Sequence, residues 1–138
     1  MNNSATPQSV RWIVYETGNR WSNSIRRFYQ HLIPPEIEVT IHRLGADQDL
    51  AASELEPRQI VLWEVNRHNL VDTFDRLLLL RNTAVSRLQL IACDRLTLSQ
   101  RLALAEFDIS GFLEQPEGLY QIKPVFDGYF ARLGWSVD

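Results

Sequence analysis

The stretch QIVLWEV, residues 59–65, is the most core-like segment of this chain of 138 residues. Its apolar side chains follow one another without alternation, which is typical of a strand buried on both faces of a parallel sheet. Residues 11–16, RWIVYE, have the same character, with four apolar side chains in sequence. The two stretches together predict the centre of a parallel sheet.

On both sides of this centre, strand-like and helix-like runs alternate along the chain. Five strands are expected at residues 11–16, 36–44, 59–65, 87–93 and 111–113, the last with a possible start at Ile109. Five helices are expected at residues 23–32, 47–55, 69–81, 99–107 and 119–133, with Ser22 or Asn23 capping the first and Ser99 the fourth. Because Pro124 is tolerated only in a first helical turn, the last helix should start late, near Lys123, or be kinked.

Strict alternation of strands and helices predicts an α/β fold. We expect a three-layer α/β/α domain with a five-stranded parallel sheet of order 2-1-3-4-5, which is a flavodoxin-like arrangement. Residues 1–10 are expected to form a flexible N-terminal tail and residues 11–138 a single domain, because a chain of this length can bury a proper core. Trp12, Trp63 and Trp135 are interpreted as packing residues.

The composition of the chain argues against several classes of function. The net charge of −3 gives no basic excess of the kind that nucleic-acid binding requires, so we expect no nucleic-acid partner. Cys93 is the single cysteine, which rules out an internal disulfide and fits a reducing compartment. The chain has neither the pattern of a signal peptide at its start nor a run of apolar residues long enough for a membrane span. These features predict a cytoplasmic protein without a membrane partner.

The stretch FDISGFLEQP, residues 107–116, resembles the end of a response-regulator receiver domain. That family typically has a Gly-Ala-Asp-Gly-aromatic-Leu stretch followed by Lys-Pro. The resemblance covers residues 11–133 in the order and length of the elements. It implies a receiver-like fold and a site at the carboxyl ends of the strands, where open parallel sheets bind ligands.

The resemblance also assigns the positions of that site. The family's magnesium-binding acidic pair falls on Glu16 together with Tyr15 or Thr17, so one carboxylate remains. Its phosphoryl-accepting aspartate falls on Glu64, its hydroxyl residue on Ala92 and its lysine on Gln115.

Each replacement works against phosphoryl transfer. A glutamate shifts the attacking oxygen by about an ångström, which can cost about 100-fold in rate. Ala92 has no hydroxyl, and Gln115 has no charge with which to stabilise the transferred group. The sequence therefore predicts a degenerate pseudo-receiver that binds no metal or cofactor and is not an enzyme.

An interaction module in signalling is the leading functional hypothesis, with a protein partner that the sequence does not identify and a possible homodimer. The resemblance implies docking through the fourth helix, the fifth strand and the last helix. The candidate residues there are Arg101, Leu104, Phe112 and Tyr120, whereas Phe126 and Tyr129 are interpreted as core residues. Glu64 would either imitate a phosphorylated aspartate or be a solvated carboxylate.

A ligand-binding or anion-binding sensor is the alternative. Its candidate contacts lie on the predicted carboxyl edge and are Arg20, Trp21, Arg67, His68 and Arg95. Trp21 is placed in a loop, where an exposed ring would suggest a partner contact. The acidic residues of the same edge could instead pair with these arginines.

Thiol catalysis and metal binding are weaker alternatives. Cys93 and His68 stand at neighbouring strand ends, as a nucleophile and its base would. However, a lone cysteine that ends a buried strand is usually a small core residue. The three histidines, His31, His42 and His68, share no metal-ligand spacing.

Overall fold

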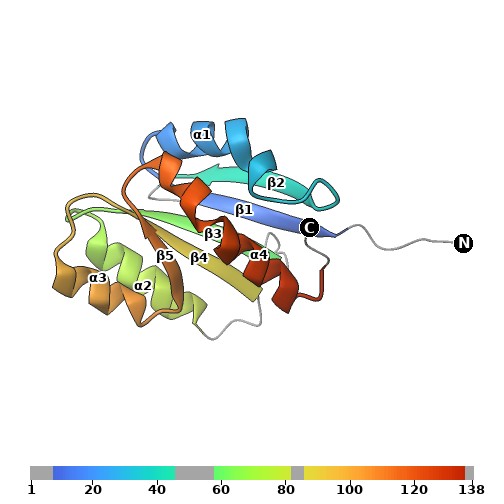
Figure 1. Ribbon diagram of the computed structural model, residues 1–138. Coiled ribbons are helices and arrows are strands. Elements are labelled where there is room, and N and C mark those ends of the chain that lie inside the picture. Colours follow the sequence, from blue (N-terminus) through green and yellow to red (C-terminus); the bar gives the residue numbers. More distant parts are fainter. Residues whose placement is uncertain (1–7, 46–57, 82–85, 136–138) are drawn as a thin grey trace, which may run out of the picture.

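Five parallel strands form the centre of the molecule in the computed structural model, which describes residues 8–45, 58–81 and 86–135. The strands are β1 (Ser9–Tyr15), β2 (Glu38–Leu44), β3 (Arg58–Val65), β4 (Ser86–Cys93) and β5 (Ile109–Leu113), and their order in the sheet is β2-β1-β3-β4-β5 (Figure 1). Each neighbouring pair is parallel. The predicted sheet order and fold class are confirmed.

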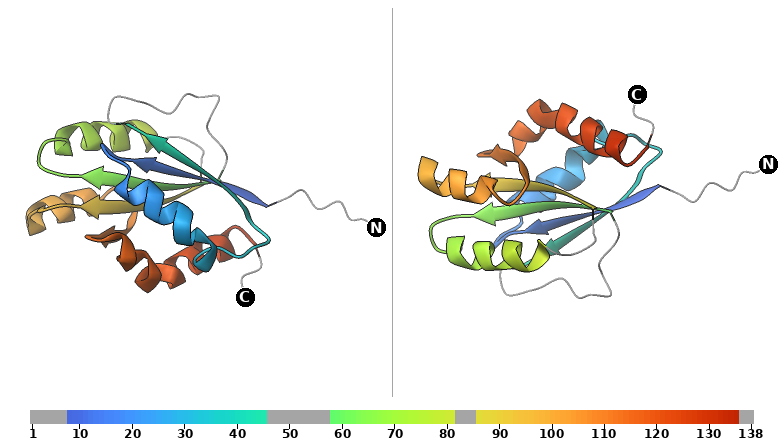
Figure 2. Two further views of the ribbon diagram at one scale, coloured as in Figure 1. Left: turned by 90° about the horizontal axis from the view of Figure 1, so that it is seen from above. Right: turned by 90° about the horizontal axis from the view of Figure 1, so that it is seen from below.

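Helices cover both faces of this sheet (Figure 2). On one face lie α1 (Arg20–Phe28) with its short 3₁₀ continuation η1 (Tyr29–His31), and α4 (Lys123–Arg132) with the preceding 3₁₀ segment η3 (Pro116–Ile122). On the other face lie α2 (Leu70–Leu80) and α3 (Leu98–Ala105). The helix predicted at residues 47–55 falls outside the described residues.

Two hydrophobic clusters fill the space between the sheet and the two helix layers. Trp12 packs against Phe126 beneath α1 and α4, with ring centroids 5.4 Å apart. Trp63 and Leu77 belong to the cluster beneath α2 and α3. Because Trp12, Trp63 and Trp135 are 0%, 2% and 8% exposed, their interpretation as packing residues is confirmed.

Several element boundaries differ from those expected. The strand β1 begins at Ser9, so Ser9 and Val10 belong to the sheet rather than to a tail. The helix α3 begins at Leu98, because Thr97 and Gln100 form a capping box in which each side chain accepts a hydrogen bond from the other residue's backbone N–H. Ser99 is therefore not the cap of this helix.

The last helix starts late, which is one of the two outcomes expected from Pro124. The 3₁₀ segment η3 runs to Ile122, and α4 begins at Lys123 with the proline in its first turn. Phe126 and Tyr129 are then directed into the core and are 0% and 2% exposed. Within the described parts of the chain, no helix combines the length and the hydrophobicity that a membrane crossing would require.

Candidate functional site

The carboxyl ends of β1, β3, β4 and β5 meet at one edge of the sheet, which we call the carboxyl edge. In the parallel register Glu64 lies beside Ala92. Both residues line one cavity of about 300 Å³ together with Gln115, and Glu16 follows the end of β1 nearby. The structure thus brings the four positions singled out from the sequence to the same edge.

Glu16 is 3% exposed, and its carboxylate binds the start of α1. Its two oxygens accept hydrogen bonds from the backbone N–H groups of Trp21 and Ser22, at 3.0 and 2.9 Å. These are the second and third residues of the helix, where N–H groups lack a partner within the helix and where a negative charge is favoured. The side chain of Asn19, at the usual cap position, makes no capping bond. Glu16 therefore takes over the role of a capping residue.

This cap explains why α1 begins at Arg20 and not at Asn23 as expected. The carboxylate from the end of β1 stabilises a first helical turn that neither Ser22 nor Asn23 caps. As a consequence Trp21 lies within the helix rather than in a loop. Its side chain is 3% exposed and packs in the core, so it offers no surface for a partner.

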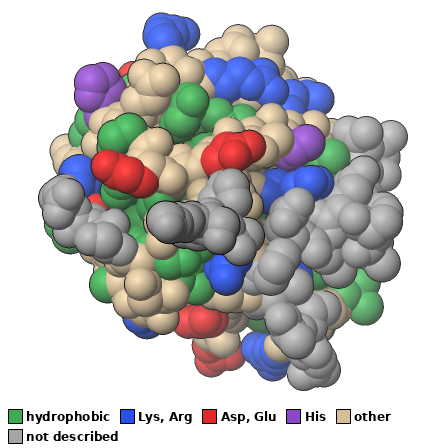
Figure 3. Space-filling view, turned by 90° about the vertical axis from the view of Figure 1, so that its right-hand side faces the viewer, with side chains coloured by type: hydrophobic (Ala, Val, Ile, Leu, Met, Phe, Trp, Pro, Cys, Tyr) green, Lys and Arg blue, Asp and Glu red, His purple; other side chains and the backbone are tan. Residues whose placement is uncertain are grey.

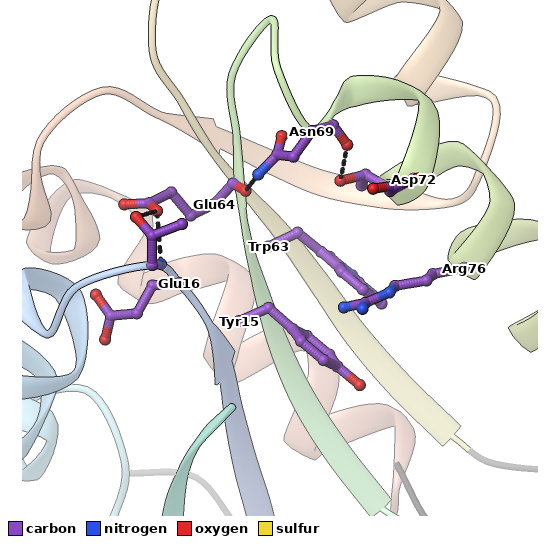
Figure 4. A pocket seen from close by; sticks show the side chains of 9 residues that line it. Tyr15, Glu16, Trp63, Glu64, Asn69, Asp72 and Arg76 are labelled. Carbon is purple, nitrogen blue, oxygen red and sulfur yellow. Dashed lines mark hydrogen bonds between the residues drawn. The ribbon is translucent and has the colours of Figure 1, made fainter. Parts of the chain in front are cut away.

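Glu64 is half-buried, and its carboxylate is also engaged. One of its oxygens accepts hydrogen bonds from the backbone N–H and the hydroxyl of Thr17, at 3.0 and 3.1 Å. Behind it, the side-chain amide of Asn69 donates to the Glu64 carbonyl oxygen at 2.8 Å (Figure 4). The carboxylate thus joins the end of β3 to the loop after β1.

Arg43 of β2 holds the same loop from the other side. Its guanidinium donates to the carbonyl oxygens of Glu16 and Thr17, at 3.1 and 2.8 Å, and to that of Gly18. Three carbonyl groups that follow β1 are thereby bound by one side chain. The planar fork of arginine donors is suited to such a cluster of acceptors.

A further bond links α1 to the segment after β5. Arg20 donates through Nη2 to the side-chain oxygen of Gln115. The position that the resemblance assigns to a lysine is thus held by a neutral acceptor, which pairs with an arginine from another element. Sequence reasoning named both residues but gave no signal that they would meet.

The charges around the cavity of about 300 Å³ do not favour an anion. Three carboxylates line it, from Glu64, Asp94 and Glu114, and the arginine among the lining residues, Arg20, is bound to Gln115. An anion placed there would be repelled by the carboxylates.

The candidate contacts of the predicted sensor do not form a single pocket. Arg95 lines a neighbouring cavity of about 260 Å³, and Arg67 and His68 line neither of the two. Both of these residues are exposed on the turn between β3 and α2. The expected grouping of the edge arginines is therefore not found among the described residues.

Cys93 ends β4 and is 7% exposed. Its thiol lies 3.6 Å from the carbonyl oxygen of Leu113, and burial raises the pKa of the thiol above its ordinary value. A raised pKa disfavours the nucleophilic thiolate. His68 is exposed, and the part of the chain that the structure describes holds no group of three or more metal-ligating side chains.

The face expected to dock a partner divides into two parts. Arg101 of α3 lies over the ring of Phe112 of β5, 5.3 Å from its centroid, and 3.8 Å from the carboxylate of Glu114. Tyr120 of η3 lies elsewhere, against Phe28 at the end of α1, with ring centroids 4.7 Å apart. The sequence placed both groups on one face because it could not show towards which neighbour η3 turns.

Leu104 does not belong to that face. Its side chain is 0% exposed and packs beneath α3. The large apolar residues of α3 that do reach the solvent are Leu98 and Leu102, which are 73% and 61% exposed. These two lie one helical turn apart on the outer side of the helix.

Sequence reasoning also missed an aromatic pair beneath the carboxyl edge. The rings of Tyr15 and Trp63 stack with centroids 4.4 Å apart, and the Arg76 guanidinium lies 5.3 Å from the centroid of the Tyr15 ring (Figure 4). The two rings line a cavity of about 30 Å³ that also includes Glu16 and Glu64. The parallel register places Tyr15 beside Trp63, so an alignment of the two strands was the available signal.

Solved structures similar to this chain support its fold. A CheY-like response regulator from Mesorhizobium loti matches with a TM-score of 0.62 and 12% sequence identity, over 88% of this chain and 99% of that one. A pilus assembly protein CpaE from Caulobacter crescentus matches with a TM-score of 0.50 and 11% identity, over 88% of this chain and 92% of that one. No family model and no curated protein matches the chain. At these identities the similarity concerns the fold.

Proposed function

We propose that this protein is a receiver-like signalling module that acts by binding a protein partner and does not take up a phosphoryl group. The fold supports the first part, because it is shared with a CheY-like response regulator. The observation that carries the second part is the state of Glu16, at the family's metal-binding position: this carboxylate is buried, and both of its oxygens accept hydrogen bonds from the backbone of α1.

Phosphoryl transfer would need a divalent cation that bridges the attacking oxygen to the phosphoryl donor. The oxygens of Glu16 face two backbone N–H groups, and this side chain is buried. A cation there would have to replace both bonds and uncap α1. Magnesium also prefers several oxygen ligands in octahedral geometry, and the described residues hold no group of three or more acidic, histidine or cysteine side chains placed to bind one metal ion.

The remaining positions lack the groups that would stabilise the transferred phosphoryl group. Ala92 has no hydroxyl, and Gln115 accepts a hydrogen bond from Arg20 instead of contributing a positive charge. Positive charge and hydrogen-bond donors supply most of the stabilisation in such reactions. Under the proposed function the carboxyl edge therefore has a structural role.

The outer side of α3 is a surface that could support docking. Leu98 and Leu102 are exposed there. Arg101 of the same helix lines a cavity of about 470 Å³ together with Phe112 and Ile122. Exposed apolar side chains beside a hollow are typical of interaction surfaces.

Phosphorylation with a small-molecule donor tests the proposal. The protein is incubated with acetyl phosphate and Mg²⁺, and separately with beryllofluoride and Mg²⁺, while an active receiver domain is treated in parallel. We expect no phosphoryl increment in the intact mass and no change in melting temperature, whereas the active receiver changes in both. A covalent phosphoryl adduct on Glu64 would refute the proposal.

A variant that restores the missing groups of the phosphoryl site provides a second test. In the triple substitution Glu64→Asp, Ala92→Thr and Gln115→Lys, the acceptor, the hydroxyl and the ammonium are restored together. We expect uptake to remain below that of the active receiver, because Glu16 still caps α1 and the second acidic residue is absent. Uptake equal to that of the active receiver would contradict the structural role given to Glu16.

A further inference from the structure

The outward face of α1 and its continuation η1 carries basic side chains without acidic ones. Arg20, Arg26, Arg27 and His31 are all exposed, and residues 20–31 contain neither aspartate nor glutamate. In Figure 3, Lys and Arg side chains lie along the top of the displayed face, on the side where α1 covers the sheet in Figure 1. This concentration contrasts with a chain whose net charge is −3.

The two central arginines of this face have no counter-ion in the described structure. Among residues 8–45, 58–81 and 86–135, the ion pairs join Arg101 to Glu114 and Lys123 to Asp127, and neither Arg26 nor Arg27 takes part in one. Their position in the last turn of α1 complements the helix dipole. That effect acts within one turn of the helix end and does not require two adjacent arginines.

An exposed aromatic ring borders the same face. Tyr120 of η3 is 48% exposed, and its ring packs on Phe28 at 4.7 Å and lies 6.2 Å from the His31 ring. Arginine and tyrosine, together with tryptophan, are enriched among the residues that contribute most to binding energy in protein interfaces. The ring is already held by its neighbours, so little freedom would be lost when it is covered.

We propose that Arg26, Arg27, His31 and Tyr120, here called the α1 basic face, bind an acidic segment of a partner protein. The inference rests on the proposed function, because it names the chemistry of the partner that an interaction module would recognise. Charge complementarity favours an acidic partner, because each guanidinium without a counter-ion is attracted electrostatically to a carboxylate that approaches it. The hydroxyl and ring of Tyr120 add contact area at the border.

The same observations argue against two other polyanions. Nucleic acids bind proteins through many phosphate contacts, and a chain of net charge −3 with two central arginines on this face offers few. A membrane surface would require apolar side chains directed outward between the basic ones, and the exposed positions of α1 are instead polar. A short acidic protein segment fits the size and the character of this face.

Binding of a fluorescent poly-L-glutamate peptide, followed by anisotropy at low salt, tests the inference. The double variant Arg26→Gln/Arg27→Gln is compared with the matched pair Arg67→Gln/Arg95→Gln, which removes the same charge from exposed positions on the carboxyl edge. We expect the α1 pair to weaken binding about tenfold and to reduce its salt dependence, and the matched pair to weaken it less than about twofold. Arg26→Lys/Arg27→Lys should retain binding, which separates charge from folding.

Three results would overturn the inference: no binding of the peptide by the wild-type protein at low salt, an equal or larger loss in the matched pair, or tighter binding of duplex DNA or phosphatidylserine vesicles through the same two arginines. The phosphoryl assay is independent of these outcomes. A phosphoryl adduct together with intact peptide binding would refute the proposed function and leave the binding of an acidic segment standing. The absence of an adduct together with the absence of peptide binding would refute this inference and leave the proposed function standing.

Discussion

Substitution of Glu16 by alanine is expected to be one of the most damaging single changes at the carboxyl edge. It removes two charge-assisted hydrogen bonds to the backbone N–H groups of Trp21 and Ser22. A hydrogen bond to a charged group contributes about 1.5–3 kcal/mol, and the loss of a helix cap costs about 0.5–2 kcal/mol. Removal of a buried carboxylate also relieves the cost of its desolvation, which offsets part of this loss.

These opposing terms leave a net loss of about 2–3 kcal/mol in the free energy of unfolding. For a chain of 138 residues, 1 kcal/mol corresponds to about 4 °C in melting temperature, so Glu16→Ala should lower it by about 8–12 °C. Glu16→Gln keeps one acceptor and turns an NH₂ group towards the other N–H, so we expect about half of that loss. Urea unfolding followed by circular dichroism measures the free energy of unfolding of both variants.

The exposed Glu36 provides the control. Glu36→Ala removes an equal charge without a buried contact and should change the free energy of unfolding by less than about 0.5 kcal/mol. If Glu16→Ala behaves like this control, the carboxylate does not cap α1 in solution, and the reasoning that starts the helix at Arg20 is wrong.

Three further outcomes are expected. Arg43→Ala should lower the free energy of unfolding by about 1–2 kcal/mol in urea titrations. Arg43→Lys should restore less than half of that loss, because a compact ammonium lacks the planar fork of donors with which the guanidinium spans three carbonyl oxygens. Burial, as the main cause, raises the pKa of Tyr129 above 10.0, so its contribution is complete below about pH 10 and is lost as the pH rises through the folded-state pKa. Urea titrations at about pH 9 and pH 11 should therefore show a smaller decline for Tyr129→Phe than for the wild type, and an equal decline would contradict this. Cys93 should react with iodoacetamide at least about 100-fold more slowly in the folded protein than in urea, and equal rates would show that the thiol is accessible.

The fold could be predicted from the sequence because its signals are local. The apolar runs in β1 and β3 have no polar alternation, and that pattern leaves a parallel sheet covered on both sides. Pro124 predicted either a late start of the last helix near Lys123 or a kink, and the structure shows the late start. Each of these signals is carried by one residue or one short stretch, so no knowledge of distant contacts was needed.

The partners of the site residues could not be predicted in the same way. The cap of α1 comes from Glu16, outside the usual N-cap position, so rules that search for serine or aspartate at the helix start place the helix too late. Trp21 was consequently assigned to a loop. The direction of η3 depends on packing against α1, which separated Tyr120 from Arg101 although both were expected on one face.

The loop after β1 shows how these contacts combine. It is bound by Glu64 from β3 and by Arg43 from β2, while Arg20 at the start of α1 reaches Gln115 beyond β5. A site that exchanges a phosphoryl group needs side chains that change their hydrogen-bond partners between the free and the phosphorylated state. A side chain that is already bound in the free state can change partners only if the phosphorylated state supplies new hydrogen bonds in place of the old ones. Among the described residues no group of three or more metal-ligating side chains is present, and the arginine that lines the cavity beside Glu64 is already bound to Gln115. Regulation under the proposed function would therefore act through the presence of the partner, and surfaces such as the α1 basic face would determine it.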